Sequence, residues 1–135
     1  MKRGEEIEVG DLVEVPAGKK GSVTAAVLYV SSHFKDVILL GFCELQVGGG
    51  PCRLSDQYFY TEVSAIKRGR WKLIKNGYAA PVDPSVSTRI VGGEVWTGDQ
   101  KVRDATSVDR KDLPKMRVAG PVLMERRAEE YLSIR

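Results

Sequence analysis

The chain has few of the side chains that metal sites and nucleophilic catalysis require. Its 135 residues include a single histidine, His33, and two cysteines, Cys43 and Cys52. These three side chains cannot supply the four ligands of an ordinary zinc site, and no serine lies in a Gly-x-Ser-x-Gly turn that His33 could serve. His33 lies in a polar loop, where a histidine is more often an exposed residue than a general base. A hydrolase that uses His33 is therefore the least favoured hypothesis. We expect a protein that is not an enzyme and that needs no metal or other cofactor.

Long apolar runs are also missing. The longest, Ala25–Val30 and Val37–Leu40, fall far short of the roughly 20 residues of a membrane-spanning helix. The N-terminus turns acidic at Glu5, where a secretory signal peptide would turn apolar. Without an export signal, free thiols are the expected state of the two cysteines, although an oxidising compartment would permit a disulfide. The sequence therefore predicts a protein with no membrane partner.

The charge balance shows no strong excess of either sign. The formal net charge is +3, with 29% charged and 42% hydrophobic residues. A dedicated nucleic-acid-binding protein usually carries a larger basic excess on one concentrated patch, so this balance permits a nucleic-acid partner without requiring one. The length and the even mixture of residues predict one domain spanning residues 1–135.

Alternating and continuous apolar patterns predict β-structure in the first half. In the segment Ser22–Val30 both faces are mostly apolar, with Val23, Ala25, Val27 and Tyr29 opposite Ala26, Leu28 and Val30. Such a strand belongs in a sheet that is covered on both sides, or in a barrel. The glycine-rich stretch Glu44–Gln57 reads as a long loop. The expected strands are Leu12–Val15, Ser22–Val30, Asp36–Phe42, a short edge strand at Tyr58–Glu62, and Arg70–Lys75.

The second half predicts a hairpin and a terminal helix. Ser85–Val91 and Glu94–Thr97 flank Gly92-Gly93, which suits a two-residue turn, and Lys101–Ala105 adds a third strand. Pro121 fits the first position of a helix that runs to about Leu132. Its expected buried face consists of Met124, Ala128, Tyr131 and Leu132. The fold class is therefore α+β: a mostly antiparallel, strongly bent sheet or a partly open barrel, with the C-terminal helix packed on it.

The segment Ile66–Ile74 has two possible readings. From Arg70 onward it alternates, so that Trp71 and Leu73 point to one face and Arg70 and Lys72 to the other. Five cations surround Trp71 between Lys67 and Lys75, and could hold a phosphate backbone while the indole stacks on a base. The alternation instead favours a core indole with solvated cations, so a nucleic-acid-binding module using Lys67–Lys75 is the alternative reading.

Two segments resemble the immunity protein 26 family of bacterial polymorphic-toxin and contact-dependent inhibition systems. Its members begin with a Gly-Asp-x-x-x-x-Pro strand and later carry Ile-Lys-x-Gly-Arg-Trp-Lys-x-Ile. Here these motifs are Gly10–Pro16 and Ile66–Ile74, and the resemblance covers about Glu8 to Ile74. It implies a β-rich, non-enzymatic immunity protein that neutralises a cognate toxin in the bacterial cytoplasm, with that toxin as its protein partner.

Within the second motif, Gly69, Arg70 and Trp71 are expected to be architectural, with Trp71 in the core and Gly69 permitting a tight turn that a side chain would obstruct. Aromatic and arginine side chains dominate binding hot spots, so exposed residues around the core strands are the expected toxin contacts. The candidates are His33, Lys35, Arg53, Tyr58, Tyr60 and Trp96.

Overall fold

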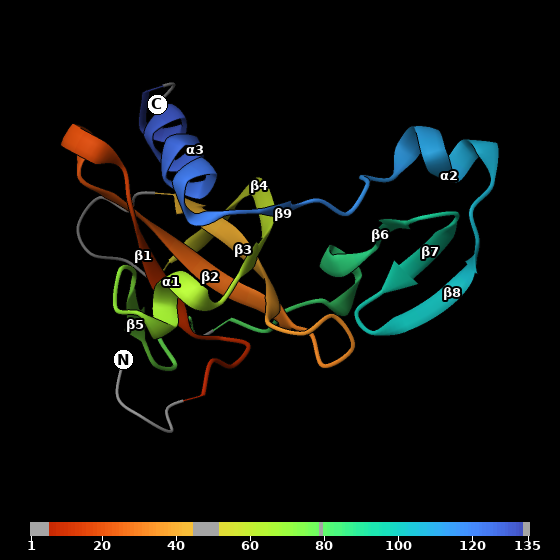
Figure 1. The fold of residues 1–135 in the computed structure, drawn as a ribbon, viewed down its shortest axis with the longest axis horizontal. Coiled ribbons are helices and arrows are strands. Elements are labelled where there is room, and N and C mark those ends of the chain that lie inside the picture. The colour runs from red at the N-terminus through yellow and green to blue at the C-terminus, as the bar shows by residue number, and fades with distance from the viewer. Residues whose placement is uncertain (1–5, 45–51, 79, 134–135) are drawn as a thin grey trace.

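The structure, a computed structural model, describes residues 6–44, 52–78 and 80–133. It contains a six-stranded sheet, a three-stranded sheet and a C-terminal helix, α3 (Pro121–Ser133). The helix lies over one face of the larger sheet, and the smaller sheet lies beyond one end of it (Figure 1). The expected α+β class is confirmed.

The larger sheet has the strand order β5-β1-β2-β3-β4-β9. All neighbouring pairs are antiparallel except β4 and β9, which run parallel. Register shifts interrupt the β2–β3 and β3–β4 ladders, and such bulges bend a sheet. The sheet is thus bent but does not close into a barrel, because β5 and β9 form its two edges. The strands are β1 (Leu12–Pro16), β2 (Ser22–Val30), β3 (Val37–Glu44), β4 (Arg53–Glu62), β5 (Lys72–Ile74) and β9 (Val118–Ala119).

Both faces of β2 are buried, as its sequence predicts. Val23, Ala25 and Val27 belong to the core on the α3 side, whereas Ala26 and Leu28 belong to a second core on the opposite face. The register shift after Val27 disrupts the simple alternation. As a consequence Tyr29 joins Leu28 in the second core instead of following Val27, and Val30 is exposed.

The terminal helix covers the first core with the face that the sequence predicts. Met124, Ala128 and Tyr131 are buried, and Leu132 packs against the same cluster at its margin. The ring of Tyr131 lies 5.4 Å from that of Phe42 on β3. Contacts with β1, β2 and β4 fix the helix across the sheet.

The smaller sheet is a meander of β6 (Arg89–Val91), β7 (Glu94–Thr97) and β8 (Gln100–Asp104). The expected hairpin around Gly92-Gly93 is confirmed, but the expected strand Ser85–Val91 is too long. Its first part is a 3₁₀ turn, Pro84–Ser87, which begins where the Asp83 side chain accepts a hydrogen bond from Ser85 N. A short helix that the patterns did not predict, α2 (Ser107–Asp112), follows β8.

Three expectations around β4 and β5 are wrong in their bounds: the long loop over Glu44–Gln57, the short edge strand Tyr58–Glu62 and the strand Arg70–Lys75. The long loop expected over Glu44–Gln57 ends early, because β4 already begins at Arg53; residues 45–51 lie outside the described residues. A one-turn helix, α1 (Ser64–Lys67), precedes β5. The strand expected over Arg70–Lys75 is the shorter β5, which begins at Lys72.

The two cysteines form a disulfide, which corrects the expectation of free thiols. Because β4 begins at Arg53 and pairs with the end of β3, Cys52 is brought beside Cys43, with 5.8 Å between their Cα atoms. The bridge therefore closes the end of the β3–β4 hairpin. Disulfides are typical of oxidising compartments, so this pair does not favour the expected cytoplasmic location.

Candidate partner-binding surface

The loop between β2 and β3 is held by one carboxylate of the smaller sheet. Asp99, in the turn between β7 and β8, accepts hydrogen bonds from Tyr29 Oη, from Ser31 Oγ at 2.6 Å, and from both the backbone N–H and the hydroxyl of Ser32 at 2.8 Å. Burial alone would raise the pKa of Asp99, but the hydrogen bonds from Ser31 and Tyr29 outweigh it and hold the pKa well below its usual range. An ionised Asp99 thus fixes the loop in place.

This tethered loop places an aromatic cluster at the surface. The exposed His33 ring lies 4.9 Å from the Trp96 ring, with 32° between their planes, and 4.6 Å from the Phe34 ring. Phe34 and Trp96 are themselves 5.5 Å apart. We call His33, Phe34 and Trp96 the junction patch, since it lies where the two sheets meet. The exposed Lys35 follows in the same loop.

A buried arginine supports the junction patch from below. Arg89 is fully buried, and its guanidinium carbon lies 5.3, 5.5 and 5.1 Å from the ring centres of Tyr29, Phe34 and Tyr60. Its Nη1 donates to the carbonyls of Ser87 at 3.1 Å and Gly98 at 2.7 Å. Cation–π contacts strengthen when water is excluded, so Arg89 joins the smaller sheet firmly to the larger one.

Sequence reasoning missed both Arg89 and Asp99. Arg89 stands in an ordinary strand pattern and Asp99 in an ordinary Gly-Asp turn. Neither position carries a local signal, because apart from the Ser87 carbonyl their partners lie between 9 and 70 positions away. Only the packing of the two sheets reveals them.

The structure separates the six candidate contacts into three groups. His33, Lys35 and Trp96 come together at the junction. Tyr60 was expected at the surface but is buried, and its hydroxyl donates to the Ser87 carbonyl at 2.9 Å. Burial raises the pKa of Tyr60 to about 12 despite the nearby Arg89 charge. Its register explains the error, because Tyr60 pairs with Leu39 and faces the second core.

The remaining two candidates, Arg53 and Tyr58, lie elsewhere on β4. Both are exposed, with Tyr58 38% accessible. Arg53 pairs with Glu44, at the end of β3 that is remote from the loop carrying His33. The structure therefore does not unite Arg53 and Tyr58 with the junction patch.

The motif Gly69-Arg70-Trp71 connects β5 with the terminal helix. Trp71 is buried in the first core, and its indole N–H donates to Glu125 Oε2 at 2.9 Å. Arg70 grips the same carboxylate with two hydrogen bonds, of 2.6 and 2.5 Å. Arg70 and Trp71 thus converge on one group instead of pointing to opposite faces, because the strand begins only at Lys72.

Glycine is favoured at position 69 by the backbone conformation there, and not by a lack of space for a side chain. Its φ is +78°, in the left-handed region that favours glycine, and its N–H bonds to the Ile66 carbonyl at 3.0 Å. A Cβ at Gly69 would have no heavy atom within 4 Å. The expected tight turn is present, but the expected steric obstruction is not.

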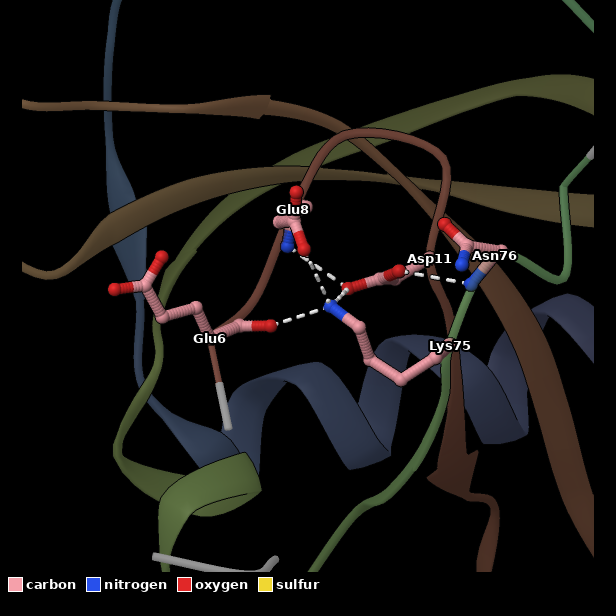
Figure 2. Close-up of polar contacts among 5 residues, drawn as sticks. All are labelled: Glu6, Glu8, Asp11, Lys75 and Asn76. Atoms are coloured by element: carbon pink, nitrogen blue, oxygen red, sulfur yellow. Dashed lines mark hydrogen bonds and ion pairs between the residues drawn. The ribbon is translucent and has the colours of Figure 1, made fainter. Parts of the chain in front are cut away.

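The two segments that carry the family resemblance lie side by side, since β1 pairs with β5. At their junction the fully buried Asp11 accepts hydrogen bonds from Lys75 Nζ at 2.7 Å, Glu8 N at 2.8 Å and Asn76 N at 2.9 Å (Figure 2). Burial opposes ionisation, but the hydrogen bonds from Asn76 and Lys75 prevail and lower the pKa of Asp11. Lys75 also donates to the carbonyl of Glu6 and to Glu8 Oε1. Both motifs are therefore part of the scaffold.

The basic segment Lys67–Lys75 is poorly arranged to bind nucleic acid. Trp71 is only 1% exposed, so its ring cannot stack on a base. Three of the five cations already face carboxylates, which would compete with phosphates for them. These ion pairs are Lys67–Asp36 at 3.8 Å, Arg70–Glu125 at 2.5 Å and Lys75–Asp11 at 2.7 Å.

Comparisons with protein-family models, curated proteins and solved structures give no match. Within residues 6–44, 52–78 and 80–133, no group of three His, Cys, Asp or Glu side chains is placed to hold a metal ion. None of the helices in these ranges is long and apolar enough to cross a membrane. Among the described residues, the ring contacts of His33, the one histidine considered as a general base, are with Phe34 and Trp96.

Proposed function

We propose that this chain is a non-enzymatic immunity protein that binds and neutralises a cognate bacterial toxin in the cytoplasm. The junction patch is the proposed contact surface, and the observation that carries the proposal is its aromatic cluster, in which the exposed His33 ring lies against the half-buried Phe34 and Trp96 rings on a tethered loop. Aromatic side chains are enriched in binding hot spots. A surface that is already ordered loses less conformational entropy when it binds.

The division of labour in the fold supports this function. Asp11 and Trp71 lie in the two segments that carry the family resemblance. Their hydrogen bonds, to Lys75 and to Glu125, stabilise the fold and not a contact surface. Specificity for one toxin then has to come from elsewhere, and the loop between β2 and β3 offers His33 and Lys35 outside those segments. Loops on a rigid framework can vary without loss of the fold.

A cytoplasmic role requires that the fold survive without its disulfide, because cytosolic thiols are kept reduced. The β3–β4 ladder extends from Val37–Glu62 to Glu44–Arg53 and holds the hairpin along its length. Cys43 is buried in the second core, where a thiol packs as a small apolar side chain. The hairpin can therefore form in the reduced protein.

Growth rescue tests the function. The chain would be co-expressed with the toxin domain encoded by the neighbouring gene, and rescue of growth is expected. Trp96→Ala should weaken the rescue, whereas Tyr58→Ala, which removes an exposed aromatic on β4 outside the junction patch, should leave it intact. Failure of the unaltered chain to rescue growth would reject the immunity function. Loss of rescue by Tyr58→Ala alone would keep the function but place the contact on β4.

A further inference from the structure

A basic pocket lies on the smaller sheet, apart from the junction patch. Its volume is about 340 Å³, within the lower range of small-ligand pockets. It is bounded by β6, by α2 and by the segment that leads from α2 to β9 (Figure 1). Its lining residues are Ile90, Gly92, Arg110, Lys115, Met116 and Arg117.

The backbone around this pocket is fixed by hydrogen bonds. Ile90 N donates to the Pro114 carbonyl and Met116 N donates to the Ile90 carbonyl, each at 2.8 Å. These bonds form a parallel bridge between Ile90 and Lys115. Lys115 and Arg117 therefore extend from a segment anchored to β6, and the cations of the pocket are brought together by the fold.

The charge of the pocket is uncompensated. It is lined by three cations and no carboxylate, and none of the ion pairs or side-chain hydrogen bonds among the described residues includes Arg110, Lys115 or Arg117. Of the two acidic residues nearest in sequence, Asp109 is engaged by Arg103 at 2.7 Å and Asp112 does not line the pocket. Like charges held together repel one another, so an anion that entered the pocket would relieve this repulsion.

A fourth cation lies behind the pocket. The Nη2 atom of buried Arg89 is 3.7 Å from the sulfur of Met116, which lines the pocket. Arg89 Nε has no hydrogen-bond partner within the described part of the chain. The buried Arg89 guanidinium is surrounded by rings and carbonyls. Because water does not screen its charge there, it adds to the positive potential of the pocket.

We infer that this pocket binds a phosphoryl group of a small molecule, such as a pyrophosphate or a phosphomonoester. Two guanidinium forks from Arg110 and Arg117 can each give paired hydrogen bonds to phosphate oxygens, and the Lys115 ammonium adds a mobile charge. The volume accommodates a compact polyanion beside the apolar side chains of Ile90 and Met116. This binding is independent of toxin recognition and goes beyond the proposed function.

Calorimetric titration of the purified full chain with inorganic pyrophosphate tests the inference. Arg117→Gln and Lys115→Gln should each weaken binding about tenfold, equivalent to about 1.4 kcal/mol. Lys111→Gln is the matched control, because Lys111 is an exposed cation on α2 that does not line the pocket. It removes the same charge and should change the affinity by less than about twofold. Unchanged thermal unfolding would show that each variant keeps its fold.

Three results would overturn the inference. The first is no binding of pyrophosphate at concentrations up to about 10 mM, well above the range expected for a specific site. The second is equal weakening by Lys111→Gln and by the two pocket variants, which would show diffuse attraction to a basic surface. A random single-stranded oligonucleotide separates the sources of phosphate: if it binds tightly and pyrophosphate does not compete with it, a nucleic-acid surface replaces the small-molecule pocket.

Discussion

Trp71 and Glu125 are joined by a hydrogen bond of 2.9 Å between the indole N–H and the carboxylate. Because Trp71 directly precedes β5 and Glu125 lies in the first half of α3, this bond fixes the terminal helix over the edge of the larger sheet. Arg70 holds the same carboxylate from the solvent side. The motif Gly69-Arg70-Trp71 is thereby a clamp between β5 of the larger sheet and the helix.

The clamp predicts a graded loss of stability. Trp71→Ala should lower the free energy of unfolding by about 3–5 kcal/mol, as expected for a large buried aromatic. Glu125→Ala should cost about 1–3 kcal/mol, because it leaves the buried indole N–H unpaired. Glu130→Ala, on the same helix but in an exposed pair with Arg127, should cost at most about 1 kcal/mol. Urea unfolding measures all three, and equal effects of the two glutamate variants would contradict the clamp.

The backbone at Gly69 makes a separate prediction. Gly69→Ala should destabilise the chain by about 1–2 kcal/mol, because an L side chain is disfavoured at a φ of +78° even where space is open. Gly93→Ala is the control, since Gly93 is also a turn glycine with room for a Cβ but without a positive φ. A thermal shift of the same size in both variants would show that conformation at Gly69 is unimportant.

Asp99 predicts a dependence of stability on pH. Its pKa in the folded chain lies below the ordinary value of 3.8, so the ionised carboxylate stabilises the fold above pH 3.8 and this stabilisation is lost as the pH falls through the folded pKa. Asp99→Asn should therefore be less stable than the unaltered chain at pH 7, and the difference should shrink below about pH 4.

Urea unfolding at a series of pH values measures the difference between the two proteins. Asp112→Asn, which neutralises an exposed aspartate at the end of α2, should show a much smaller difference at every pH. A deficit for Asp99→Asn that is equally large at pH 7 and below pH 3 would contradict the role of the charge, because the carboxylate would then act the same in both protonation states.

The disulfide predicts a modest effect of reduction. The cysteines are separated by nine positions, and a bridge that closes so short a loop contributes about 2–3 kcal/mol on the chain-entropy account. Reduction should lower the free energy of unfolding by about this amount while the protein stays folded. Denaturant unfolding with and without a thiol reductant measures it, with the double variant Cys43→Ser/Cys52→Ser as the control that should not respond. Complete unfolding on reduction would contradict a cytoplasmic role.

Local patterns predicted the parts of the fold whose signals are complete within one segment. The continuous apolar run of β2 required cover on both sides, and the helical spacing of Met124, Ala128 and Tyr131 gave the buried face of α3. The start of β4 was missed because its polar residues from Arg53 onward face water and resemble a loop. Because only one face of this part of β4 is buried, its apolar pattern is weak. The adjacent residues Gly48–Pro51 have a strong turn composition, which favoured a loop.

The candidate site was predictable only in part, for a different reason. His33 is exposed and Trp96 is half-buried, and their residue types alone could nominate both as contacts. Their meeting depends on Arg89 and Asp99, which join two sheets through contacts that are distant in sequence. A bulge in β2 also moved Tyr29 to the other face, and no periodicity in the sequence marks where a ladder shifts its register.

The central claim is that the junction patch binds the toxin, and a calorimetric titration of the purified pair tests it most directly. The unaltered chain should bind with a dissociation constant below about 1 μM, or about −8 kcal/mol. Trp96→Ala and His33→Ala should each raise it at least about thirtyfold, the 2 kcal/mol of a hot spot, while Tyr58→Ala should change it less than about threefold. Binding weaker than about 1 μM by the unaltered chain, or binding that neither junction variant weakens, would contradict the account.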